Sequence, residues 1–178
     1  MSPPADPVRV HAACLAGDIA ALRDALGHPD DFPHTRDACG GSCLTYALYH
    51  APLPLVAALL DLGADPNEAV DDGFPPLFAA IDSNHPDRAE RVALLLARGA
   101  DPQQRGVNDY TALHQAACLD NAEAVRLLLA AGADPQARTR IDHYATALEE
   151  AEHFGHPAGA AALRLALGLG PRAGEDSR

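Results

Sequence analysis

Apolar and small residues recur along the chain in a pattern that repeats about every 34 residues. The fourth copy is the most complete and reads Thr111-Ala112-Leu113-His114-Gln115-Ala116-Ala117, then Val125, Leu128-Leu129 and Gly132-Ala133-Asp134. A hydroxyl residue precedes the first apolar segment as a helix cap would, and a glycine follows the second as a helix stop would. Each copy therefore predicts two short helices joined by a turn.

Two anchors place the copies in register. The glycine of a Gly-Ala-Asp-Pro segment recurs as Gly63, Gly99 and Gly132, at intervals of 36 and 33 residues. An upstream apolar position, spaced 34, 33, 36 and 35 residues apart, is occupied by Val10, Leu44, Leu77, Leu113 and Leu148. Because several anchors share one period, we expect five units, at residues 7–35, 36–69, 70–105, 106–138 and 139–168.

This pattern resembles the ankyrin repeat, in which Thr-Pro-Leu-His opens a short helix and Gly-Ala-Asp-x-Asn follows a second helix and leads into a hairpin. The resemblance covers nearly the whole chain, from Val8 to Leu167. It implies an all-α fold, an ankyrin-repeat solenoid of stacked helix–turn–helix units with short β-hairpin or loop connections. It also implies a single domain over residues 1–168 and a concave groove formed by the hairpins and the first helices. The tail, residues 169–178, lacks periodicity and is expected to be disordered.

Some units depart from the family pattern. The first and last are atypical, as terminal caps of a repeat array should be. Thr111 is expected to cap its helix, with Ser42 and Thr146 equivalent, whereas the third unit has Pro75 at this position. His114 resembles the family histidine that bonds back toward the preceding turn. The third unit is also longer than the second, with its extra residues in the turn at 83–87.

Charge restricts the class of partner. The formal charge is -12 and the pI is about 4.9. Because nucleic-acid and anionic-membrane binding needs clustered basic residues, neither is an expected partner. A basic protein would be attracted to the negative electrostatic field of this chain. An excess of acidic residues also simply keeps many proteins soluble.

Other features of the sequence favour a cytoplasmic protein. The N-terminal residues lack the basic and apolar stretches of a secretory signal. No apolar run approaches the roughly 18 residues that span a bilayer. The four cysteines are not spaced as a disulfide framework, which favours reduced thiols. The richness in Ala, Leu, Arg and Pro suggests a GC-rich, bacterial genome.

Residues that the repeat scaffold does not specify are the candidates for function. Five of the eight aromatic residues fall at hairpin or first-helix positions, where a merely soluble solenoid would carry polar side chains. The predicted partner-binding residues are Tyr49, His50, Asp71, Asp72, Phe74, Asp82, Asn108, Tyr110, Leu119, His143, Tyr144 and Phe154. Two alternatives stay open: the aromatics pack on neighbouring hairpins, or Asp71 and Asp72 serve only as turn residues.

The sequence gives only weak support for a metal site or a catalytic site. Cys39 and Cys43, with His34 and His50 nearby, lack the paired spacing of a structural zinc site, so neither a metal nor a cofactor is expected. An acid–base pair could be formed near the C-terminus by His143, His153 and His156 with Glu149, Glu150 and Glu152. No nucleophile or phosphate-loop motif accompanies them, which favours surface histidines on a terminal cap.

The favoured interpretation is therefore a non-catalytic module that binds another protein through the groove, with a monomer as its simplest assembly. An adaptor, an inhibitor and an immunity protein are all compatible with it, since fold does not settle function. The alternatives are an enzyme or ligand-binding protein that uses the His-rich C-terminal region, or a secreted effector.

Overall fold

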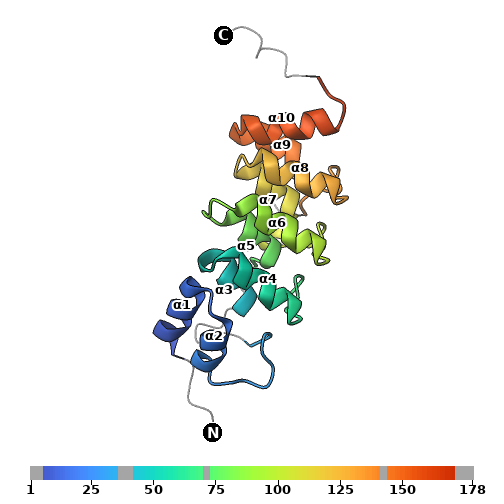
Figure 1. Ribbon diagram of the computed structural model, residues 1–178. Helices are drawn as coiled ribbons and strands as arrows, with labels where there is room; N and C mark the ends of the chain where they lie inside the picture. Colours follow the sequence, from blue (N-terminus) through green and yellow to red (C-terminus); the bar gives the residue numbers. More distant parts are fainter. Residues whose placement is uncertain (1–5, 36–41, 70–72, 141–143, 171–178) are drawn as a thin grey trace. The chain divides into compact units, whose positions relative to one another are not determined.

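The computed structural model describes residues 6–35, 42–69, 73–140 and 144–170 (Figure 1). Over these residues the predicted all-α fold is confirmed, since regular structure there consists of helices and two isolated β-bridges, with no strand. The elements are α1 (Pro7–Ala16), α2 (Ile19–Ala25), α3 (Cys43–His50), α4 (Leu53–Asp61), α5 (Pro76–Asp82), α6 (Arg88–Ala97), η1 (Val107–Asp109), α7 (Ala112–Cys118), α8 (Ala122–Ala130), α9 (Ala147–Phe154) and α10 (Pro157–Ala166).

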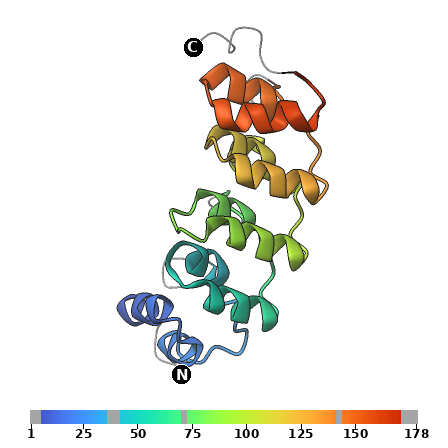
Figure 2. The same cartoon turned by 45° about the horizontal axis from the view of Figure 1, so that its top comes forward.

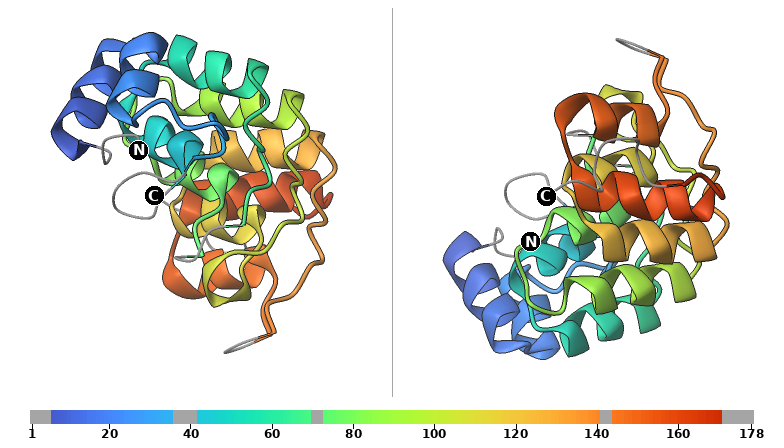
Figure 3. Two further views of the ribbon diagram at one scale, coloured as in Figure 1. Left: turned by 90° about the horizontal axis from the view of Figure 1, so that it is seen from below. Right: turned by 90° about the horizontal axis from the view of Figure 1, so that it is seen from above.

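The chain divides into two compact units, residues 1–101 and 102–178, which we call the N-unit and the C-unit. In the N-unit, three helix pairs stack so that α1, α3 and α5 form one row and α2, α4 and α6 form a second (Figure 2). In the C-unit, α7 packs against α9 and α8 against α10 (Figure 3). Because each pair buries its apolar side only against its neighbours, stacking is the main source of stability within each unit.

The helix starts follow the sequence. The Ser42 hydroxyl accepts hydrogen bonds from the backbone N–H groups of Leu44 and Thr45 at 3.2 and 3.3 Å. Thr146 accepts from the Glu149 N–H at 3.3 Å, and the Glu149 carboxylate accepts from the Thr146 N–H at 2.9 Å, which completes a capping box. Pro75 makes no side-chain cap, but Pro76 after it opens α5 where a missing N–H is not needed.

His114 links two repeats of the C-unit. Its Nδ1 accepts from the backbone N–H of Thr111 at 3.4 Å and lies 2.9 Å from the Thr111 hydroxyl, as the family resemblance implies. Its Nε2 donates to the carbonyl of Ala145 at 3.1 Å, one repeat further along the chain. Since one ring nitrogen accepts and the other donates, the imidazole is neutral, and its burial lowers its pKa.

Arg91 links two repeats of the N-unit and is fully buried. From α6 its guanidinium donates to three carbonyls at the end of α3, those of Ala47, Leu48 and Ala51, at 3.4, 3.2 and 2.7 Å. It is also paired with the Asp87 carboxylate, with an Nε to Oδ1 distance of 2.7 Å. The charge is therefore both neutralised and hydrogen-bonded, which a buried arginine requires.

Candidate functional site

The first helices of the N-unit border a cavity of about 390 Å³, which we call the N-unit cleft. Its lining comes from the last turns of α3 and α5 and the turn that follows α5, and comprises Tyr49, His50, Asp82, Asn84, His85 and Pro86. His85 closes one side, because its Nε2 donates to the carbonyl of Tyr49 at 3.0 Å. The long turn at 83–87 thus supplies both a wall of the cleft, through His85, and Asp87, the partner of Arg91.

A cluster of imidazole and phenol rings lies beside this cleft. His11 on α1 places its Nδ1 2.8 Å from the Tyr46 hydroxyl on α3. The His50 ring centroid is 5.3 Å from that of His11 and 4.5 Å from that of Tyr46. Burial, followed by the neighbouring His11 and His85, lowers the pKa of His50. His50 is therefore neutral near pH 7 and presents its ring and its hydrogen-bonding nitrogens rather than a positive charge.

In the C-unit, the Tyr110 hydroxyl lies beside two polar side chains, the half-buried Cys118 and the buried Glu150. The phenol is hydrogen-bonded to Cys118 on α7 and to Glu150 on α9, and Glu150 is only 3% exposed. Burial, with Cys118 and Glu150 adding to it, raises the pKa of Tyr110, and burial also raises the pKa of Cys118. The phenol and the thiol are therefore protonated at neutral pH, which makes Cys118 a poor nucleophile.

A second cavity, of about 230 Å³, opens next to Glu150, and we call it the C-unit cavity. It is lined by Ala145, Glu149, Glu150 and His153. Three large apolar side chains of the same unit are exposed to solvent: Leu119 at 42%, Tyr144 at 61% and Phe154 at 56%. The Phe154 ring centroid lies 4.8 Å from that of His153, and Tyr144 directly precedes Ala145 in the chain. We call these three side chains the C-unit apolar surface.

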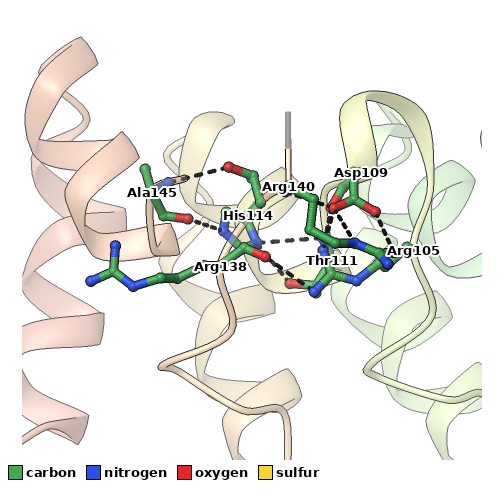
Figure 4. A network of polar contacts seen from close by, with 8 residues as sticks. Arg105, Asp109, Thr111, His114, Arg138, Arg140 and Ala145 are labelled. Atoms are coloured by element: carbon green, nitrogen blue, oxygen red, sulfur yellow. Dashed lines mark hydrogen bonds and ion pairs between the residues drawn. The ribbon is translucent and has the colours of Figure 1, made fainter. Parts of the chain in front are cut away.

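Arginines link the loop at Asp109 to the backbone of the next repeat, next to Tyr144 (Figure 4). The Asp109 carboxylate accepts from Arg105 at 2.8 Å and from Arg140 at 2.8 and 3.0 Å, and these contacts, that with Arg140 first, lower its pKa. Arg105 also donates to the carbonyl of Arg138 at 3.1 Å, and Arg138 donates to the carbonyl of Tyr144 at 2.7 Å. Charge-assisted hydrogen bonds thus hold the backbone carbonyls of Asp109, just before Tyr110, and of Tyr144.

The predicted partner-binding residues divide by exposure. Asn108, Leu119, Tyr144 and Phe154 are exposed. Tyr49, His50, Phe74, Asp82 and Tyr110 are half-buried. Asp71, Asp72 and His143 lie outside the described residues. The structure brings Tyr49, His50 and Asp82 together in the N-unit cleft, and it places Tyr110 beside Cys118 and Glu150, which lie on α7 and α9 and not on a neighbouring hairpin.

Several residues of these sites were not singled out from the sequence as partner-binding. His11 and Tyr46 belong to the ring cluster, and His85 lines the N-unit cleft. The three residues lie far apart in the chain, and only the repeat register could have aligned the first two. Glu150 was considered only as one of three glutamates near histidines. Its burial could have been inferred from its place three residues after the inward-facing Ala147, on the same face of the helix.

The residues considered for chemistry are dispersed. Cys39 lies outside the described residues, Cys43 is buried, and His50 belongs to the ring cluster. Within the described ranges, no group of three or more His, Cys, Asp or Glu side chains is placed to hold a metal ion. His153 and His156 make ring contacts with Phe154, and Glu152 is paired with Arg164 at 2.7 Å.

Comparisons with known proteins agree with the repeat architecture. A family model described as "Ankyrin repeats (3 copies)" matches residues 53–139 and 88–166, which together span more than half of the chain. A curated mouse protein, "Ankyrin repeat and MYND domain-containing protein 1" of Mus musculus, is 38% identical over 79 residues, covering 41% of this chain. The match spans only 8% of the length of that relative. No helix in the described part of the chain is long and apolar enough to cross a membrane.

Proposed function

The chain belongs to the ankyrin-repeat family, and because ankyrin repeats are generally protein–protein interaction modules, we propose that it binds a partner protein through its first helices and hairpins. The proposal treats the protein as a non-catalytic, monomeric and cytoplasmic module. Adaptor, inhibitor and immunity-type roles are all compatible with such a module, and they differ in what the captured partner does.

The observation that carries the proposal is the C-unit apolar surface. A side chain as large as Tyr144 or Phe154, left half or more exposed, forgoes the roughly 1.5–3 kcal/mol that burial would provide. Exposed aromatics at loop and helix ends are the residues that anchor protein interfaces, where single anchors contribute about 2 kcal/mol or more. Burial of these side chains by a partner would therefore supply much of the affinity.

Preorganisation of the hairpins supports the same proposal. The Arg105, Arg138 and Arg140 contacts fix the backbone that carries Tyr144, so little conformational freedom is lost when a partner docks. A rigid scaffold that presents apolar anchors can bind tightly through a modest area.

Charge suggests the kind of partner. Residues 1–101 contain 15 acidic residues against six arginines, and residues 102–178 contain ten against seven. A basic partner protein would be attracted to this field, and the association would weaken as salt increases. The same balance disfavours a nucleic-acid partner.

The test is affinity capture from the source organism, comparing wild type with a variant that carries Leu119→Ser, Tyr144→Ser and Phe154→Ser. A matched control replaces Leu62, Leu165 and Leu169, which are also exposed, at the ends of second helices or beyond them. We expect a stoichiometric partner that the control retains and the surface variant loses. Retention by both variants, or loss by both, would count against binding through this surface.

A further inference from the structure

Glu150 presents a carboxyl group that is almost fully removed from water and yet makes no ion pair with any residue that the structure describes. It is 3% exposed, and in the described part of the chain its one side-chain hydrogen bond is to Tyr110, a neutral phenol. The two neighbouring glutamates on α9 are both neutralised, Glu149 by Arg138 at 2.9 Å and Glu152 by Arg164 at 2.7 Å. Among the described residues, Glu150 therefore differs from Glu149 and Glu152 in having no cation beside it.

Burying a carboxylate is costly unless a cation and further hydrogen bonds compensate it. Tyr110 supplies one hydrogen bond, and a carboxylate has room for several more. Glu150 lines the C-unit cavity of about 230 Å³, so the compensating group can reach it from outside the protein. The site is thus shaped for a charged group that the described residues do not provide.

We propose that the C-unit cavity is a recognition pocket for an arginine side chain of the partner protein, with the Glu150 carboxylate as the acceptor for its guanidinium. This inference rests on the proposed function and specifies the chemistry of the partner. It is independent of the apolar contacts that Leu119, Tyr144 and Phe154 would make.

Arginine fits the cavity better than other cationic groups. The guanidinium is planar, weakly hydrated and always charged, so it enters a buried carboxylate site more readily than an ammonium does. His153 lines the same cavity, and its ring offers a flat surface on which a guanidinium can stack. The acidic charge of the whole chain, -12, favours the approach of a basic residue.

The pocket is tested with Nα-acetyl-arginine amide as the probe and Nα-acetyl-citrulline amide as its neutral isostere, at matched ionic strength. Binding is followed through the backbone amide chemical shifts of Ala145, Glu149, Glu150 and His153. We expect saturable shifts at these residues with the arginine probe and at least about tenfold weaker binding of the citrulline probe. Equal effects of the two probes, or no saturable shift at these amides, would overturn the assignment.

Two variants locate the binding group. Glu150→Gln keeps an oxygen acceptor for Tyr110 and removes the charge, so binding of the arginine probe should be lost. Glu123→Gln removes one charge from the exposed face of α8, away from the cavity, and should leave binding unchanged. Undiminished binding in Glu150→Gln would assign the effect to another group and contradict the proposal.

The two proposals fail separately. If the arginine probe does not bind but the surface variant still loses its partner, protein binding through the apolar surface stands without the pocket. If the probe binds in the cavity and the surface variant retains its partner, the pocket stands and the apolar surface is excluded.

Discussion

Arg91 in the N-unit and Gly159 in the C-unit occupy the same position of the repeat, four residues before the buried Leu95 and Leu163. Both face the carbonyl at the equivalent place in the first helix of the preceding repeat. Arg91 donates to the Leu48 carbonyl at 3.2 Å, whereas a Cβ on Gly159 would lie 2.9 Å from the Ala117 carbonyl oxygen. One repeat fills this position with a long cationic side chain and the other leaves it empty, so the contact made at this position differs from repeat to repeat.

The polar links between repeats differ in the same way. In the C-unit, His114 reaches the carbonyl of Ala145 in the next repeat. The matching positions of the N-unit hold His11, whose Nδ1 lies 2.8 Å from the Tyr46 hydroxyl of the next repeat, Thr45, whose buried hydroxyl has no hydrogen-bond partner among the described residues, and Phe78, which is fully buried. The N-unit therefore connects its first and second repeats through His11 and its second and third through Arg91. A repeat array can exchange its connecting residues while it keeps the same helix pairs.

The largest expected effect comes from removal of Arg91. Arg91→Ala leaves three carbonyls at the end of α3 and the Asp87 carboxylate without their donor, so we expect a loss of about 3–5 kcal/mol in the free energy of unfolding. Chemical denaturation measures the loss, and hydrogen exchange should show that it is concentrated in α3 and α6. A loss below about 1 kcal/mol, or one spread evenly over both units, would contradict the role of Arg91 as a link between repeats of the N-unit.

A smaller loss is expected from Gly159→Ala. The added methyl group meets backbone atoms of Ala117 that cannot rotate away, so α10 must shift, at a cost of about 1–3 kcal/mol. Ala124→Gly, at the same position of the preceding repeat, serves as the matched comparison, since it creates space instead of a clash. If thermal unfolding shows Gly159→Ala to be as stable as wild type, the close approach of α10 to Ala117 is not a constraint.

The smallest effect is the pH dependence that His114 gives the C-unit. Burial lowers its pKa below the ordinary value of 6.5, so the unfolded chain takes up a proton at a higher pH than the folded one. The corresponding stability is fully present above pH 6.5 and is lost as the pH falls toward the folded pKa. Unfolding measured between about pH 5 and 8 should therefore show less acid sensitivity in His114→Asn than in wild type. An unchanged slope would show that His114 does not contribute, although His50 adds a dependence of the same sign in the N-unit.

The repeat pattern predicted the helix pairs and most of their starts, because caps and buried leucines act locally or recur at a fixed spacing. The polar links could not be predicted in the same way. Arg91 lies on α6, and the three carbonyl groups that accept its hydrogen bonds lie 40, 43 and 44 residues earlier in the chain. The sequence shows that Arg91 departs from the repeat pattern. It does not show which carbonyl groups the guanidinium contacts.

The candidate site could be predicted only in part, because it too depends on contacts between segments that are distant in the sequence. Register alone placed Leu119, Tyr144 and Phe154 at outward positions, and all three are exposed. Tyr110 occupies an equally promising hairpin position but turns inward, because Glu150 and Cys118 offer it partners from two other segments. Whether an aromatic residue at a hairpin is an anchor or a packing residue depends on such neighbours, which the sequence does not place.

The central claim, that the C-unit apolar surface contacts a partner protein, is tested most directly by site-specific photocrosslinking in the source organism. A photoreactive phenylalanine analogue is placed at Tyr144, at Phe154 or, as a control, at Leu165, which is 78% exposed on α10. The account predicts one discrete crosslinked protein from Tyr144 and Phe154 and none from Leu165. A crosslink from Leu165 alone, or none from any position, would contradict it.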